Sequence, residues 1–439
     1  MKLISIPESE YAKYKNGVIF EGYKWDPQYL DNNTIAKHVL IISEGEHNEL
    51  EKLTEKLYNE TVQAEMVLCN NLKLTKSLNL PRKIRKELAR MENYKKEKHI
   101  RLMRFDFHPV ADGKLVVREF NSDVVDGQWD NSDAADEGQW NNSDAADGWW
   151  AISEVNSDVP GGFAEASRMP AIAGGLFTEE NYCYKDFGEI IVNAFVNKVK
   201  TGGKIVLVHC TSYSDDRQAM QFLGDSFRAA GFQVIYAAAD HLRFRENKAV
   251  CILGGYEGEA DAIFRFNPLE WLVDIKPKRW NGYFDTVTPS CNHPVAVFAQ
   301  TKRFPLVWDR LEEFGVDLTT WRALLPETIE VKDAKNLDNF IYKPVYGRVG
   351  EGISIKEACR ENEYSKILKD VKKRPKKYMA QKRFNSRELT DENGSSFHVC
   401  LGSYCIDGNA AGYYARISEK PRIDSSAADI PVLIEKSVI

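Results

Sequence analysis

The stretch from Lys204 to Phe266 constrains the fold more than any other part of the chain, because strand and helix patterns alternate there with short connections. In chain order, the patterns indicate a strand at 205–209, a helix at 215–230 and strands at 233–237, 250–253 and 262–266. This alternation predicts a lobe built on a parallel sheet. The chain of 439 residues is too long for one ordinary core, so we expect two or three packed lobes. Residues 1–100 are expected to be mainly helical, and the last hundred residues rich in strands, with one helix near 361–372.

Composition and charge exclude several classes of function. The formal net charge is -6, which predicts neither a nucleic-acid partner nor binding to an anionic membrane. No apolar run approaches the roughly 20 residues that span a bilayer, and the first residues lack the apolar core of a secretory signal. The eight cysteines form no CxxC pair and no zinc-site spacing, so we interpret them as free thiols of a cytoplasmic protein.

A polar β-hairpin is predicted from strands at 101–108 and 114–121, joined by the turn residues 111–113. Because residues i and i+2 share one face of a strand, Glu119 and Asn121 project together. Asp106 on the first strand adds a second carboxylate to that of Glu119 and to the amide oxygen of Asn121. Such a set of oxygen ligands would suit Mg²⁺. A solvated hairpin that binds no metal explains the same residues.

The hairpin strand and its turn are present twice. The pattern from Asp112 to Val124 recurs from Asp147 to Val159 at a constant offset, so Glu154 and Asn156 repeat the pair at 119 and 121. Between them, residues 121–158 are acidic and repetitive, with Asn-Ser-Asp starting at 121, 131, 142 and 156. A tandem duplication explains the pattern better than chance, and it is too short for a solenoid. We expect part of it to be a mobile loop.

A glycine-rich loop follows Lys343. Residues 341–345 predict a strand and 353–355 its return, with glycines at 347, 350 and 352 between them. Glycines let backbone N–H groups approach phosphate oxygens, while Lys343 and Arg348 would add positive charge. The loop is not a Walker A motif, which opens a helix. A glycine-rich hairpin without a ligand remains the alternative.

The C-terminal region contains a second predicted hairpin. Residues 402–416 read as two strands joined by an Asp-Gly turn at 407–408, and Arg416 stands where the second strand ends. Taken alone, Arg416 is best interpreted as an exposed residue at a strand end.

Five motifs in order resemble the synthetase domain of glutathionylspermidine synthase and its relatives, a circularly permuted ATP-grasp family. The matching segments are Arg104-Phe105-Asp106, Glu154-Val155-Asn156-Ser157-Asp158-Val159-Pro160, the loop 343–350, Tyr378-Met379-Ala380-Gln381 and Ala411-Gly412-Tyr413-Tyr414-Ala415-Arg416. The resemblance covers about residues 20–435. It implies a mixed α+β and α/β fold that is ATP-grasp-like and circularly permuted, with a parallel-sheet pre-ATP-grasp lobe and a helical N-terminal region.

The resemblance also implies roles for single residues. Asp106 would hold Mg²⁺ together with Glu154 and Asn156, or with Glu119 and Asn121. Arg104 would stabilise the transferring phosphoryl group, and Arg416 would face the phosphates or the acyl intermediate. Nucleotide-contacting residues would be Lys302, Lys343, Gly347, Arg348, Gly350 and Gln381. The sequence departs from the family at Thr301, where relatives carry Asn, and it lacks the separate amidase domain of bifunctional relatives.

The implied function is an ATP-dependent carboxylate–amine ligase that uses ATP and Mg²⁺ and works through an acyl phosphate. Its partners would be a small carboxylate and an amine, including a peptide or a polyamine. Two alternatives stay open: a non-catalytic nucleotide-binding or interaction protein of the same fold, and a kinase-like transfer that stops at the phosphorylated substrate. The expected regions are 1–100 (helical N-terminal part), 101–185 (metal-binding hairpin with the insertion 121–158), 186–300 (α/β lobe) and 301–439 (nucleotide-binding lobe).

Overall fold

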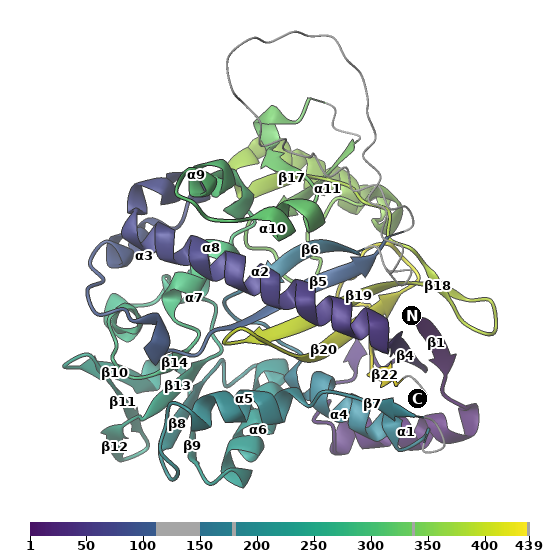
Figure 1. The fold of residues 1–439 in the computed structure, drawn as a ribbon, viewed down its shortest axis with the longest axis horizontal. Helices are drawn as coiled ribbons and strands as arrows, with labels where there is room; N and C mark the ends of the chain where they lie inside the picture. Colours follow the sequence, from purple (N-terminus) through teal and green to yellow (C-terminus); the bar gives the residue numbers. More distant parts are fainter. Residues whose placement is uncertain (111–149, 178–180, 336–338, 437–439) are drawn as a thin grey trace.

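A long antiparallel sheet forms the centre of the molecule (Figure 1). The computed structural model describes residues 1–110, 150–177, 181–335 and 339–436. The central strands run in the order β21-β20-β19-β5-β6, with β18 paired to β19. Their bounds are β5 (Leu102–Pro109), β6 (Trp150–Asn156), β18 (Leu389–Thr390), β19 (Ser396–Ile406), β20 (Asn409–Ser418) and β21 (Ala428–Ile430). The turn between β19 and β20 has positive φ at Asp407 (49°) and Gly408 (97°), so the predicted Asp-Gly hairpin is confirmed.

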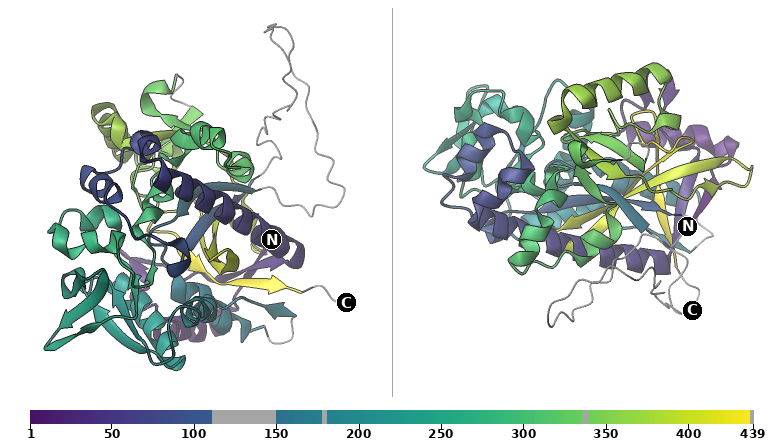
Figure 2. Two further views of the ribbon diagram at one scale, coloured as in Figure 1. Left: turned by 60° about the vertical axis from the view of Figure 1, so that its left-hand side comes forward. Right: turned by 90° about the horizontal axis from the view of Figure 1, so that it is seen from above.

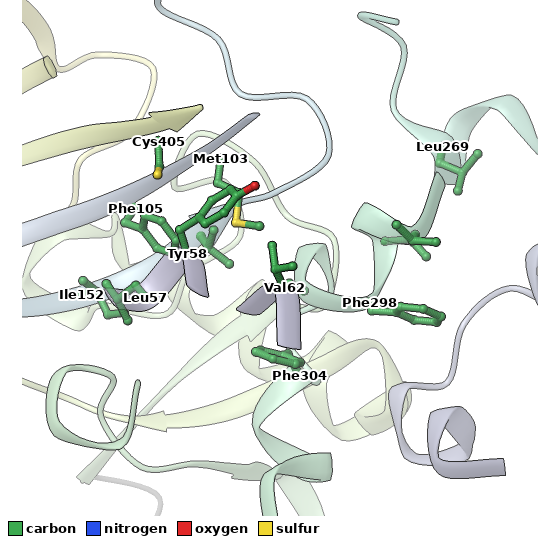
Figure 3. Close-up of a cluster of buried hydrophobic side chains, with 14 of the residues drawn as sticks. Leu57, Tyr58, Val62, Met103, Phe105, Ile152, Leu269, Phe298, Phe304 and Cys405 are labelled. Carbon is green, nitrogen blue, oxygen red and sulfur yellow. The ribbon is translucent and has the colours of Figure 1, made fainter. Parts of the chain in front are cut away.

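One face of this sheet is covered by α2 (Glu44–Asn70), which crosses it diagonally in Figure 1. The helix begins with a capping box, in which the Ser43 hydroxyl accepts from the Glu46 N–H and the Glu46 carboxylate accepts from the Ser43 N–H. Its buried face carries Leu57, Tyr58 and Val62. Figure 3 shows these side chains in the buried cluster that also contains Met103, Phe105, Ile152, Phe304 and Cys405. This core therefore supports β5 and β6 on the face of the sheet that α2 covers.

The parallel-sheet lobe is confirmed. Its strands run in the order β14-β13-β8-β9, and all three pairings are parallel. The elements of this lobe are α5 (Phe187–Val196), β8 (Lys204–Val208), α6 (Ser214–Ala229), β9 (Gln233–Ala237), β13 (Ala262–Arg265), α7 (Leu269–Leu272), β14 (Ser290–Cys291) and α8 (Val297–Gln300).

The strand expected at 250–253 lies outside this parallel sheet. As β11 (Lys248–Leu253) it is the middle of an antiparallel sheet between β10 (Leu242–Arg245) and β12 (Tyr256–Glu259). Two-residue turns with positive φ at 246–247 and 254–255 reverse the chain on both sides of it. Such turns build hairpins, so β11 pairs with its sequence neighbours and not with β8.

A smaller lobe, here called the α11 lobe, contains α11 (Glu361–Lys373) and the sheet β15-β17-β16. Its strands are β15 (Thr328–Glu330), β16 (Phe340–Pro344) and β17 (Tyr378–Lys382), and α9 (Trp308–Glu313) and α10 (Thr319–Leu324) precede it. The helix predicted near 361–372 is confirmed. The return strand expected at 353–355 is absent from this described segment: β16 pairs with β17, and Ser354 only bonds the backbone of Tyr342. Figure 2 shows the α11 lobe and the parallel-sheet lobe on opposite sides of the central sheet.

The two chain ends meet in a fifth sheet, ordered β1-β4-β22-β7. Its strands are β1 (Lys2–Ser5), β4 (His38–Ser43), β7 (Tyr182–Cys183) and β22 (Val432–Glu435), and α1 (Glu8–Phe20) and α4 (Phe163–Gly174) pack against it. Other elements of the first hundred residues are β2 (Gln28–Tyr29), β3 (Asn32–Asn33) and α3 (Arg82–Leu88). The first hundred residues thus contain buried strands as well as helices. In β4 the four residues 39–42 are all buried, which short-range helical periodicity does not reveal.

The result is a mixed α+β fold with one parallel sheet, one mixed sheet and several antiparallel ones. The central sheet joins strands from the expected regions 101–185 and 301–439, so the four-region division stays a prediction. Among the described residues, no helix combines the length and the apolar character needed to cross a membrane.

Candidate active site

Four side chains predicted from the sequence meet where β5 and β6 pair. Asp106 lies opposite Glu154, and Arg104 lies opposite Asn156. The Arg104 guanidinium donates to both carboxylate oxygens of Asp106, with Nε–Oδ1 2.7 Å and Nη2–Oδ2 3.1 Å. The Asn156 amide donates to Asp106 Oδ2 at 2.9 Å. The other expected metal pair, Glu119 and Asn121, lies outside the described residues.

Two lysines bring positive charge to this strand pair. Lys302 Nζ lies 2.8 Å from Glu154 Oε2, and Lys343 Nζ donates to the carbonyl oxygen of Ser153 at 3.0 Å. Burial alone would raise the pKa of Glu154, but Lys302 and Lys343 outweigh it and hold that pKa below its usual value. Burial, reinforced by Lys302, lowers the pKa of Lys343 to about 8, although Glu154 opposes the shift. Glu154 is therefore ionised at neutral pH.

Two close contacts, at Arg348 and Gly350, position the glycine-rich loop. Arg348 Nη2 donates to Glu270 Oε1 of α7 at 2.7 Å, and the guanidinium lies 5.6 Å from the centre of the Trp271 ring. Gly350 has a φ of 65°, and a Cβ there would stand 2.3 Å from the carbonyl oxygen of Ile423. Only glycine fits this close approach of two backbones. In this structure Arg348 is thus an anchor of the loop on the parallel-sheet lobe.

Arg416 and Gln381 complete the set of predicted residues. Arg416, on β20, donates through Nη2 to the carbonyl oxygens of Asp424 and Ala427, the latter at 3.3 Å. Its Nε lies 3.5 Å from a carboxylate oxygen of Asp429. Gln381 is buried in the α11 lobe, where its Nε2 donates to the Thr328 hydroxyl at 3.0 Å and its Oε1 has no hydrogen-bond partner among the described residues.

A cavity of about 910 Å³ unites most of these side chains. Of the predicted residues, its lining includes Arg104, Asp106, Glu154, Asn156, Lys343, Arg348, Gly350 and Arg416. In the described part of the chain, Lys302, Gly347 and Gln381 are not part of that lining; Lys302 instead links Glu154 to the Gly347 carbonyl oxygen, at 2.7 Å from Nζ.

Sequence reasoning missed several cavity residues. Tyr414 packs its ring 5.0 Å from the Arg104 guanidinium, and the i, i+2 relation to Arg416 on β20 is a signal that could have identified it. Arg383 and Phe384 line the cavity just after β17, close to the expected Gln381. His108 also faces the cavity, and burial followed by the nearby Lys343 lowers its pKa to about 3. A lone histidine on a strand gives no such signal.

The donor atoms on β5 and β6 fit Mg²⁺ by their chemistry. Asp106 and Glu154 sit on directly opposed positions of neighbouring strands, beside a cavity large enough for phosphate groups. Mg²⁺ is commonly bound through one or two carboxylates, with water and substrate phosphates filling the rest of its shell. Among the described residues, no three His, Cys, Asp or Glu side chains form a metal-binding group.

Comparison with known proteins identifies the family. A family model described as "Glutathionylspermidine synthase preATP-grasp" matches residues 129–435. The solved structure of a glutathione synthetase like-effector (GSS30) from Globodera pallida in apoform superposes with a TM-score of 0.60 at 10% identity, covering 98% of this chain and 99% of that one. A putative gamma-glutamylcysteine synthetase from Methylobacillus flagellatus KT gives a TM-score of 0.39 at 13% identity, covering 85% and 84%. No curated protein matches the sequence. The effector shares the fold, and the family model covers well over half of the chain, so the protein belongs to the glutathionylspermidine synthase family.

Proposed function

We propose that the protein is an ATP-dependent ligase that joins a carboxylate to an amine through an acyl phosphate. The observation that carries the proposal is the meeting of Arg104, Asp106, Glu154 and Asn156 with Lys343 around one cavity of about 910 Å³. These residues come from the central sheet and from the α11 lobe, so a ligand between them is held from two sides. Membership of a synthetase family supports the same reading.

In the proposed reaction, a substrate carboxylate attacks the γ-phosphorus of ATP, and ADP leaves. The amine then attacks the acyl carbon, and inorganic phosphate and a proton leave as the amide forms. Lys343 would neutralise charge on the nucleotide phosphates beneath the glycine-rich loop, where the lack of side chains at the glycines would let phosphate oxygens approach the backbone. Arg104 and Arg416 would stabilise charge on the transferring phosphoryl group and the acyl phosphate.

Asp106, Glu154 and Asn156 would hold Mg²⁺, which supplies further neutralisation of phosphate charge when bound. In the structure described here, Arg104 and Lys302 neutralise the two carboxylates. Binding of a nucleotide would give both cations phosphate oxygens as alternative partners. The carboxylates would then be free for the metal.

The same two ion pairs favour the alternative of a nucleotide-binding protein without ligase activity. If Arg104 and Lys302 keep Asp106 and Glu154 occupied, the metal cannot enter and no phosphoryl transfer follows. ATP titrated into the full chain with and without Mg²⁺ separates the alternatives, followed by assay of ADP release with a panel of acids and amines. A ligase needs the metal and releases ADP with an acid–amine pair. Mg²⁺-independent binding without ADP release contradicts the proposal.

A further inference from the structure

The mouth of the cavity carries an unusual number of exposed apolar side chains. Tyr29, Tyr213, Trp271 and Val349 all line the cavity and are 44%, 57%, 59% and 50% exposed. They come from four separate segments: β2, the residue before α6, α7 and the glycine-rich loop. We call these four residues the apolar rim. Large apolar side chains that gather around a cavity mouth mark a contact surface, whereas single exposed ones need no explanation.

Two contacts link neighbouring segments of the apolar rim in pairs. The backbone N–H of Trp25 donates to the Gln218 side chain at 3.0 Å, which ties the β2 segment to α6. Trp271 lies against the Arg348 guanidinium, next to Val349. Aromatic rings at a surface bury much area at a small entropic cost when a ligand covers them.

Acidic side chains stand beside the apolar rim. Asp26, Asp215 and Asp216 line the same mouth, and none of the three forms an ion pair with another described residue. Their charge reaches the rim itself: Asp215 is the largest cause, ahead of burial and Asp216, of a raised pKa at Tyr213. Two cations near these carboxylates are already paired: Lys24 with Glu165 and Asp429, and Arg348 with Glu270. A ligand at this mouth therefore meets aromatic rings together with carboxylates that have no ion-pair partner among the described residues.

We propose that the apolar rim binds the outer part of the amine substrate, and that this substrate is a peptide carrying basic and aromatic side chains. The inference rests on the proposed ligase function and names the class of its amine. A polyamine would satisfy the three carboxylates but has no planar or branched group for the four rim residues. An acidic peptide would meet like charge at the mouth. A basic, aromatic peptide satisfies both features, since lysine and arginine pair with carboxylates and also stack on aromatic rings.

The test uses fluorescently labelled tetrapeptide amides and the full chain, without nucleotide. The probes are an alternating lysine–tyrosine peptide, a lysine–glycine peptide and a glutamate–tyrosine peptide, with spermidine as an unlabelled competitor. We expect the lysine–tyrosine peptide to bind at least about tenfold more tightly than either other peptide, because only it matches both ring and charge. Spermidine should displace it weakly.

The double variant Tyr29→Ala, Tyr213→Ala should lower the affinity for the lysine–tyrosine peptide by about tenfold and leave thermal unfolding unchanged, since both rings are exposed. Phe314→Ala removes a ring of similar exposure, 52%, outside the cavity lining and should change nothing. Equal binding of all three peptides, tighter binding of spermidine, or wild-type affinity in the double variant overturns the inference. The binding assay contains no ATP, so its result does not depend on ligase activity. A separate assay that shows no ADP release would contradict the ligase proposal and not the peptide site.

Discussion

Lys302 Nζ lies 2.8 Å from the Glu154 carboxylate and, at the same time, donates to the Gly347 carbonyl oxygen at 2.7 Å. One ammonium group thus connects the strand that carries the proposed metal ligands with the loop that would cover the phosphates. Lys302 does not line the cavity described here, so it contacts both elements from outside the cavity. The position of the loop and the charge at Glu154 are therefore coupled through a single side chain.

The first prediction concerns Lys343. Replacing it with alanine (Lys343→Ala) should lower ATP turnover on the order of 10²- to 10³-fold, as is typical for loss of one group that stabilises developing charge. The side chain lines the cavity and ends at the Ser153 carbonyl oxygen, so circular dichroism should stay native. ADP release under saturating Mg²⁺ measures the effect. Turnover near that of the unaltered protein would contradict the proposal that Lys343 binds phosphate.

The second prediction separates the two candidate metal pairs. Glu154 lies directly opposite Asp106 on β6, so Glu154→Gln should raise the Mg²⁺ concentration for half-maximal ADP release by about tenfold or more, since one of two ligand charges is lost. The matched change Glu119→Gln should leave that concentration unaltered. Calorimetric titration of Mg²⁺ into the ATP complex gives a second readout. The reverse pattern in the two variants would assign the metal to Glu119 and Asn121.

The third prediction is a dependence of stability on pH. Burial, with Lys98 second, lowers the pKa of His99 from 6.5 to about 4. Between these values the unfolded chain binds a proton that the folded chain does not, so stability rises with pH. The contribution is complete above about pH 6.5 and is lost as the pH falls towards 4. Urea unfolding at several pH values should show this slope, and His99→Gln should reduce it. An unchanged slope in the variant would show that His99 is not the group responsible.

Patterns that span only a few neighbouring residues predicted the β19–β20 hairpin and the helix α11. The Asp-Gly turn at 407–408 predicted its hairpin, and the sequence near 361–372 predicted the helix α11. The pairing of β5 with β6 was harder, because the residues between them in sequence repeat the β6 pattern. Period-two spacing placed Glu154 and Asn156 on one face, but only the fold brings them to Asp106.

Long-range packing explains most of what the sequence did not reveal. Arg348 stays a predicted phosphate contact, and the sequence did not reveal that it also pairs with Glu270, which is 78 residues away and carries no motif. Gln381 stays a predicted nucleotide contact, and its bond to Thr328 on the neighbouring strand β15 was likewise not foreseen. In both cases the residue type limits what the side chain can bind, and the tertiary contact selects the partner.

The last prediction concerns the ion pair that joins the end of β6 to the parallel-sheet lobe. The carboxylate of Asp158 and the guanidinium of Arg265 are both fully buried, and Asp158 Oδ2 also accepts from the Leu269 N–H at 2.9 Å. Burial would raise the pKa of Asp158, but Arg265 outweighs it and holds the pKa below its usual value. Asp158→Asn leaves the Arg265 charge without its counterion and should cost about 3–5 kcal/mol of unfolding free energy.

An exposed pair of the same kind supplies the control for this measurement. Glu259 and Lys248 are 62% and 51% exposed, and Glu259→Gln should change the unfolding free energy by no more than about 1 kcal/mol. Because Leu269 begins α7 and the next residue, Glu270, holds Arg348, loosening Asp158 should also release the glycine-rich loop. Limited proteolysis between Lys343 and Gly352 should therefore accelerate in Asp158→Asn and stay unchanged in Glu259→Gln. Equal stability losses in the two variants would show that burial of the pair does not determine its contribution.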